Sequence, residues 1–139
     1  AFHRYYFDNI TATGTPMFER GRPGLGDMVR HIKNGRPLAM LIDQHMDDGA
    51  ALKFFGQTAY TALSAAQMAL KYDSELVPFY AIRQANGPPF RIILEAPITR
   101  GSAEAMTQAL NDSLEARVRA DMGQWLWSHK RWKTPRKNQ

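Results

Sequence analysis

Residues 37–56, with the sequence PLAMLIDQHMDDGAALKFFG, combine an apolar run, a cluster of ionisable side chains and a second apolar run. The first run, at 38–42, is apolar at every position, which is typical of a strand buried on both faces in a parallel sheet. A helix is the alternative, but the five residues between Pro37 and Asp43 are too few for one. Ligands of open α/β sheets bind beyond the carboxyl ends of the strands, so we expect the chemistry near Asp43.

The polar cluster behind this strand alternates carboxylates with an imidazole, a pattern that metal sites also use. An EF-hand calcium loop requires Gly at its sixth position and Glu at its twelfth, where this sequence has Asp48 and Phe54. We therefore predict no metal ion here. A strand-to-loop turn that binds the polar head group of a substrate, or that is simply solvated, also explains these residues and does not require particular residues at fixed positions. The cluster consists of Asp43, Gln44, His45, Asp47 and Asp48, of which the first two are the substrate-binding candidates.

The flanking sequence predicts alternating strands and helices. A short helix capped by Asp27, with Gly35 just past its end, precedes the first buried strand. A second helix begins at Thr58 or Thr61 and runs to about Tyr72. From Ser102 onward an apolar residue recurs every four positions, which predicts a long amphipathic helix with Ser102 as its cap. Further strands are expected at 15–19, 51–55, 76–82 and 90–94, the last antiparallel to its neighbour. The predicted fold is therefore an α/β layered domain with a largely parallel central sheet flanked by helices.

Composition limits the classes of protein. The chain has 139 residues, 44% of them hydrophobic and 22% charged, which suits one globular domain or most of one. It contains no cysteine, which excludes disulfides and thiolate metal sites. The formal net charge of +5 favours an anionic partner, either nucleic acid or an acidic membrane surface, and a solvated basic tail is the other interpretation.

Charged residues follow three of the predicted strands. If those strands are parallel, Arg20, Asp43 and Arg83 reach the same edge of the sheet, where arginine could hold a phosphorylated substrate. Of the two arginines, Arg20 is the substrate-binding candidate and Arg83 is expected to be structural. His3 and Asp8 form a His-x4-Asp pair that could act as a general base, although such pairs often arise by chance.

Several short blocks resemble the glycerolipid acyltransferase superfamily. Residues 14–20, GTPMFER, resemble the block whose arginine contacts substrate phosphate, and Asp43 stands where another block presents an acidic residue after a strand. Residues 77–80, VPFY, resemble a third block. Two further runs resemble one family within this superfamily, the bacterial lipid A biosynthesis acyltransferases: FFG at 54–56 and QWLWSHKRWK at 124–133. Nearly the whole chain is similar to this family.

This resemblance implies transfer of a fatty acyl chain from an acyl carrier protein thioester, or from acyl-CoA, to a hydroxyl of a lipid A precursor or related glycolipid. It implies no cofactor, and it places the enzyme at the cytoplasmic face of the inner membrane. The family's dyad is His-x4-Asp or His-x4-Glu, whose histidine is the general base toward the acceptor hydroxyl. That dyad lies well upstream of the arginine block, whereas His3 and Asp8 lie close to Arg20.

We therefore expect residues 1–139 to be the C-terminal portion of a single acyltransferase domain, incomplete at its N-terminus and inactive alone. The catalytic dyad and an N-terminal membrane anchor are expected upstream of Ala1. The resemblance assigns substrate binding to Arg20, Asp43 and Gln44.

Two groups of aromatic residues complete the prediction. Phe54 and Phe55 are expected to line the acyl-chain path, with core packing as the alternative. The basic, Trp-rich tail at 124–139 is expected at an anionic membrane surface, because indoles favour the headgroup level and cationic side chains attract anionic lipid. Its interfacial residues are Trp125, Trp127, Lys130, Arg131, Trp132 and Lys133.

Two other functions stay open at this point. A nucleic-acid-binding module would use Trp interleaved with Lys and Arg to stack on bases and neutralise phosphates. Against it, many of the basic residues gather at one end of the chain and no recognised binding motif is present. The other function is that of an acyltransferase-like domain that has lost its dyad and serves only in interaction.

Overall fold

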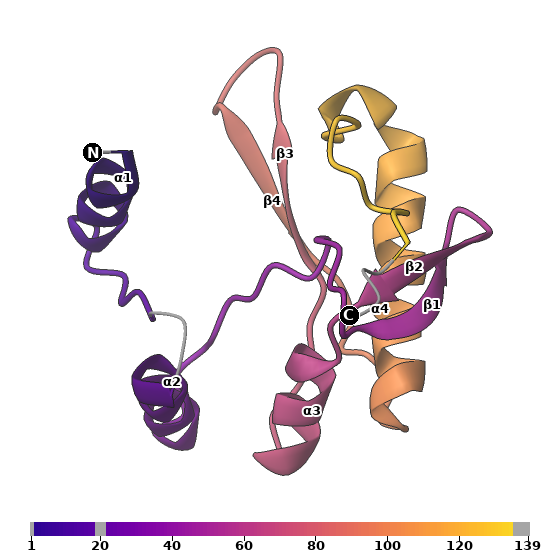
Figure 1. Cartoon of the computed structure of the whole chain (residues 1–139). Helices are drawn as coiled ribbons and strands as arrows, with labels where there is room; N and C mark the ends of the chain where they lie inside the picture. Colours follow the sequence, from indigo (N-terminus) through magenta and orange to yellow (C-terminus); the bar gives the residue numbers. More distant parts are fainter. Residues whose placement is uncertain (1, 19–21, 135–139) are drawn as a thin grey trace. The chain divides into compact units, whose positions relative to one another are not determined.

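The computed structural model describes residues 2–18 and 22–134. The chain divides into two compact units, Ala1–Ala39 and Met40–Gln139, and each is described by itself. Figure 1 shows helices in the first unit and a mixture of helices and strands in the second. The predicted α/β composition is therefore correct at the level of secondary structure.

The first unit contains two helices, α1 (Phe2–Thr11) and α2 (Arg22–Lys33). Helix α2 begins five positions before the predicted cap, so Asp27 lies inside the helix and pairs there with Arg30 one turn later. The helix ends as predicted, because Gly35 adopts a φ of 70° and donates to the carbonyl of Ile32 at 2.8 Å. No strand forms at 15–18.

The first hairpin of the second unit joins β1 (Ala50–Phe54) to β2 (Gln57–Thr61). The two turn residues, Phe55 and Gly56, have φ angles of 52° and 73°, the backbone that two-residue hairpin turns favour. The predicted strand at 51–55 is thus confirmed within one residue. The predicted helix from Thr58 or Thr61 is wrong at its beginning, because this segment pairs with β1, and α3 (Ser64–Lys71) follows it.

The second hairpin joins β3 (Phe79–Arg83) to β4 (Phe90–Leu94) in the antiparallel arrangement that the short connection predicted. Helix α4 (Ala103–Ala120) begins at the predicted cap, where Ser102 Oγ accepts from the backbone N of Ala105 at 3.1 Å. A single 3₁₀ turn, η1 (Met122–Gln124), follows the end of α4.

The core of the second unit lies against α4, which packs on β1 and α3 (Figure 1). Two clusters of buried side chains form it. One centres on Phe54, with Trp125 and Trp132 packed beside it, and the other joins α3 to Met106 of α4. The Phe54 cluster is the part of the core that supports residues 124–133, called the C-terminal segment below.

The predicted parallel sheet is absent from the described residues, which contain two separate two-stranded antiparallel sheets. Residues 38–42 form no strand there, and Leu41 is 81% exposed. A run that is apolar at every position needs neighbours on both faces, and the described residues supply no strand that pairs with it. The edge at which Asp43 and Arg83 were expected to meet is therefore not formed by parallel strands.

Candidate functional site

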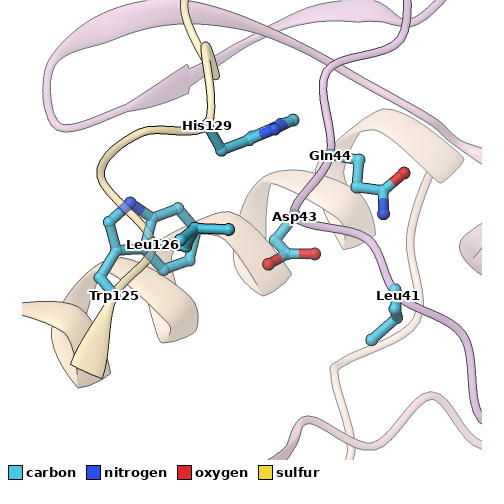
Figure 2. A pocket seen from close by; sticks show the side chains of 6 residues that line it. All are labelled: Leu41, Asp43, Gln44, Trp125, Leu126 and His129. Carbon is cyan, nitrogen blue, oxygen red and sulfur yellow. The ribbon is translucent and has the colours of Figure 1, made fainter.

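A pocket in the second unit brings the polar turn after residue 42 together with the C-terminal segment. Its volume is about 170 Å³, and Figure 2 shows the carboxylate of Asp43, the amide of Gln44 and the imidazole of His129 around it. Two of its apolar lining residues, Leu41 and Leu126, are 81% and 70% exposed, so apolar side chains flank the pocket where it meets solvent. The full lining is Leu41, Asp43, Gln44, Trp125, Leu126 and His129.

His129 ties the two walls of this pocket together. Its Nε2 accepts a hydrogen bond of 3.2 Å from the backbone N–H of His45, directly after the predicted pair Asp43 and Gln44. Because Nε2 is the acceptor, a neutral His129 carries its proton on Nδ1. In the sequence, His129 stood out only as part of QWLWSHKRWK at 124–133, the C-terminal signature of the family resemblance, so its place in the site was missed.

The loop at 43–49 is seated on β2. The backbone N of Met46 donates to the carbonyl of Tyr60 at 3.1 Å, and the His45 ring meets the Tyr60 ring edge-on at 6.1 Å. The side chain of His45 is 2% exposed, and its Nε2 lies 2.8 Å from Asp47 Oδ1. In the part of the chain that the structure describes, no cluster of three or more His, Cys, Asp or Glu is arranged to hold a metal ion.

Arg131 is a buried cation within electrostatic reach of Asp43. Arg131 is 0% exposed, although it was predicted to face a membrane. Burial lowers the pKa of its guanidinium, and the negative charge of Asp43 acts in the opposite direction. The positive charge of Arg131 and the negative charge of Asp43 therefore attract each other, although Arg131 does not line the pocket.

The predicted acyl-chain residues have different environments. Phe54 is completely buried, stacked on Trp132 at 5.7 Å between ring centroids and tilted against Trp125 at 5.6 Å. Phe55 is partly buried beneath the guanidinium of Arg119, 4.6 Å from its ring centroid. Neither lines this pocket, but Phe54 supports Trp125, which does. An acyl-chain role for either residue stays a prediction.

The predicted membrane residues separate into two groups. Trp125 and Trp132 pack against Phe54, and Trp132 Nε1 donates to the Phe54 carbonyl at 3.0 Å. Together with the buried Arg131 they belong to the core. Trp127 is 49% exposed, so it is the indole of the three that is available to a membrane or to a nucleic acid base. The exposed members of the predicted set are Trp127, Lys130 and Lys133.

Comparison with known proteins identifies the family. Residues 11–134 match the family described as bacterial lipid A biosynthesis acyltransferase. The chain belongs to this acyltransferase family. A phosphatidylinositol mannoside acyltransferase of Mycolicibacterium smegmatis is 22% identical over 128 residues, which are 91% of this chain and 42% of that protein. Two Mycobacterium tuberculosis proteins of the same name, from strains CDC 1551 and H37Rv, are also 22% identical over 128 residues, at 91% of this chain and 40% of theirs.

The chain thus spans about two fifths of the length of these acyltransferase relatives. Its own His-x4-Asp pair falls on α1, where residues five apart differ by about 140° around the helix axis and do not share a face. The side chain of His3 lies outside the described residues, whereas Asp8 is exposed. Arg20, the predicted phosphate ligand of the acyltransferase block, also lies outside them.

Arg83, which was expected to be structural, closes β3. Its guanidinium lies over the Phe90 ring at 5.7 Å, and its backbone N and carbonyl both bond the side chain of Gln124. Gln124 therefore attaches the start of the acyltransferase signature at 124–133 to the hairpin. Among the described residues, no helix has the length and apolar character that a membrane span requires.

Proposed function

We propose that this chain is part of an enzyme that transfers a fatty acyl group from an acyl carrier protein thioester, or from acyl-CoA, to a hydroxyl of a glycolipid. The acceptor would be a lipid A precursor or, as the names of the relatives suggest, a phosphatidylinositol mannoside. The observation that carries the proposal is the pocket in which Asp43 and Gln44 meet His129 of the C-terminal signature, within a chain of this acyltransferase family.

The chemistry needs a base that takes the proton of the acceptor hydroxyl, so that the oxygen attacks the thioester carbonyl. The C–S bond then breaks, and the departing thiolate receives the proton from the base. In this proposal the base belongs to a His-x4-Asp or His-x4-Glu pair outside the chain. His129 is not that base, because its Nε2 already accepts a hydrogen bond from His45. Asp43 accepts, and Gln44 donates or accepts, hydrogen bonds that orient the polar part of the substrate.

The parallel sheet belongs to this proposal as well. The relatives are more than twice as long as the matched segment, so a complete enzyme has further chain to place beside it. We propose that residues 38–42 become a strand when strands of that further chain pair with them. Four side chains on one face of the second hairpin are more than half exposed, which supports an additional layer there: Phe79, Phe90, Ile92 and Leu94.

The C-terminal segment is proposed to contact an anionic membrane surface at the cytoplasmic face of the inner membrane. The residues that carry this role are the exposed Leu126, Trp127, Lys130 and Lys133. Leu126 also lines the pocket, so a lipid held at this surface would have its polar head close to Asp43.

The test is Asp43→Asn in the whole protein, assayed for transfer of a labelled acyl group from an acyl carrier protein to a glycolipid. We expect kcat/KM to fall about 100-fold or more, since loss of an orienting or proton-handling group costs that much. The protein should stay folded but lose some stability, because the substitution removes a negative charge that acts on the buried Arg131. The matched control is Asp73→Asn, an exposed carboxylate that pairs with Arg100. Equal activity of the two variants would refute the assignment of the site.

A further inference from the structure

Arg131 occupies an unusual position for an arginine near the end of a basic segment. Its side chain is completely buried, with Nη1 donating to the carbonyl of Tyr60 at 2.9 Å and Nη2 to Thr61 Oγ1 at 2.6 Å. Nη2 also lies 3.5 Å from Asn111 Oδ1, and the guanidinium stands 5.6 Å from the centroid of the Phe54 ring. The guanidinium thus joins the C-terminal segment to β2 and α4 at one point.

These hydrogen-bond partners are neutral oxygens, so the charge of Arg131 is not cancelled by a bonded carboxylate. Burying a charge in this way is costly unless the surrounding geometry is closely specified. Asn111 contributes to that geometry, because its Nδ2 donates to the Lys53 carbonyl at 3.1 Å and to Thr61 Oγ1 at 3.3 Å. Thr61 Oγ1 in turn donates to the Ala59 carbonyl at 3.0 Å, so the whole network is fixed to the first hairpin.

Hydrogen bonds of the residues next to Arg131 connect the buried guanidinium to the pocket. The backbone N of Arg131 donates to the carbonyl of His129 at 2.8 Å, which closes a tight turn between the two. On the other side, Trp132 is held to Phe54 by its indole N–H. His129 then reaches the backbone N of His45 across the pocket. A shift of the guanidinium is therefore expected to displace His129 from the backbone N of His45.

We propose that Arg131 is a positioning residue of the pocket, and that its bonds to Tyr60 and Thr61 hold His129 in place against the loop that carries Asp43 and Gln44. The effect of Arg131 on catalysis rests on the proposed function. Its effect on the position of His129 does not, and that effect is measurable without a substrate.

The test uses Arg131→Met and Arg131→Lys in the whole protein, with nitrogen NMR of the histidine side chains in alkaline buffer, where imidazoles are neutral. In the wild type, His129 is expected as the tautomer with its proton on Nδ1. In Arg131→Met, this signal is expected to shift to a tautomer mixture, and kcat is expected to fall about 100-fold with a smaller change in KM, since small misplacements cost that much. Arg131→Lys should restore part of both.

The control is Arg117→Met, because Arg117 is less buried than Arg131, pairs with Glu95 and does not line the pocket. It should lower stability and leave the His129 signal unchanged. If Arg131→Met does not fold, Thr61→Val is the alternative: it removes Oγ1, the acceptor of the Arg131 Nη2 hydrogen bond, at similar side-chain volume. It should shift the His129 tautomer in the same direction.

Two results would overturn the proposal: a wild-type His129 signal in folded Arg131→Met or in Thr61→Val, or an equal change of the signal in Arg117→Met. If the His129 signal responds as expected but the wild-type protein transfers no acyl group to any glycolipid, the proposed function fails and the positioning role stands.

Discussion

The backbone of Gly49 packs directly against the backbone of Thr61, so closely that a β-carbon at Gly49 would lie 2.7 Å from Thr61 N and 2.8 Å from its carbonyl carbon and oxygen. Gly49 closes the loop that carries Asp43 and Gln44, and Thr61 is one of the two residues of β2 to which Arg131 donates. The same short stretch of strand therefore supports both walls of the pocket.

The first prediction concerns this contact. Gly49→Ala forces backbone against backbone and should lower the free energy of unfolding by about 1–3 kcal/mol, the usual cost of overpacking, measured by urea denaturation. The control is Gly101→Ala, whose β-carbon would meet only Ala105 Cβ at an ordinary 3.7 Å. The control should change stability by less than about 0.5 kcal/mol. Equal losses in the two variants would show that the loop is not seated on β2 as described.

The second prediction isolates backbone strain in the β1–β2 turn. Gly56 has a φ of 73°, and a β-carbon at this position would meet no atom within 4 Å, so Gly56→Ala should cost about 1–2 kcal/mol through its backbone alone. Asn tolerates this left-handed conformation, so Gly56→Asn should lose clearly less. The measurement is the midpoint and slope of denaturant unfolding for both variants. If Asn costs as much as Ala, the turn does not require a positive φ at this position.

The parts of the fold that could be predicted from sequence are those with local causes. Ser102 was recognised as a cap because its hydroxyl serves a backbone N–H only three residues later. The turn after β1 was missed because a bulky residue at positive φ is unfavourable in isolation. Phe55 adopts it here with support from α4, since its N–H donates to Glu115 Oε2 at 2.5 Å and its ring lies under Arg119. The sequence around Phe55 gives no indication that Glu115 and Arg119 contact it.

The candidate site divides in the same way. Asp43 and Gln44, which line the pocket, were proposed from the sequence because they follow an apolar run, which is a local signal. His129 bonds a residue 84 positions away, so neighbouring sequence could not place it. Arg131 was assigned to a membrane surface with Lys130, although in the structure one is buried and the other exposed. Arg131 is buried because β2 and α4 supply hydrogen-bond acceptors for its guanidinium. A count of basic residues in the sequence cannot show these acceptors.

The third prediction concerns acid stability. A hydrogen bond from Ser113 lowers the pKa of Glu95 below its ordinary value of 4.5, burial opposes this, and the bond and charge of Arg117 lower the pKa further. Because the pKa is lower in the folded state, the unfolded chain binds the proton more readily, and the stabilisation is complete above pH 4.5. It is lost as the pH falls through the folded-state pKa.

Glu95→Gln should therefore be less stable at pH 7 and should lose less further stability than the wild type between pH 5 and pH 3, roughly the range over which such carboxylates are protonated. Chemical denaturation at a series of pH values measures both effects. Glu75→Gln, at an exposed residue, serves as the control and should retain the wild-type slope. A Glu95→Gln profile as steep as the wild type would exclude Glu95 as a source of the acid dependence.

The fourth prediction tests the proposed membrane surface with its two exposed cations. A lysine near an anionic surface contributes about 1 kcal/mol, so Lys130→Gln combined with Lys133→Gln should weaken co-sedimentation with phosphatidylglycerol-containing vesicles by about 30-fold. The loss should shrink at high salt, where charges are screened. Lys71→Gln, an exposed lysine at the end of α3, is the control for net charge. Equal weakening per charge in the control would indicate that overall charge, and not the C-terminal segment, attracts the vesicles.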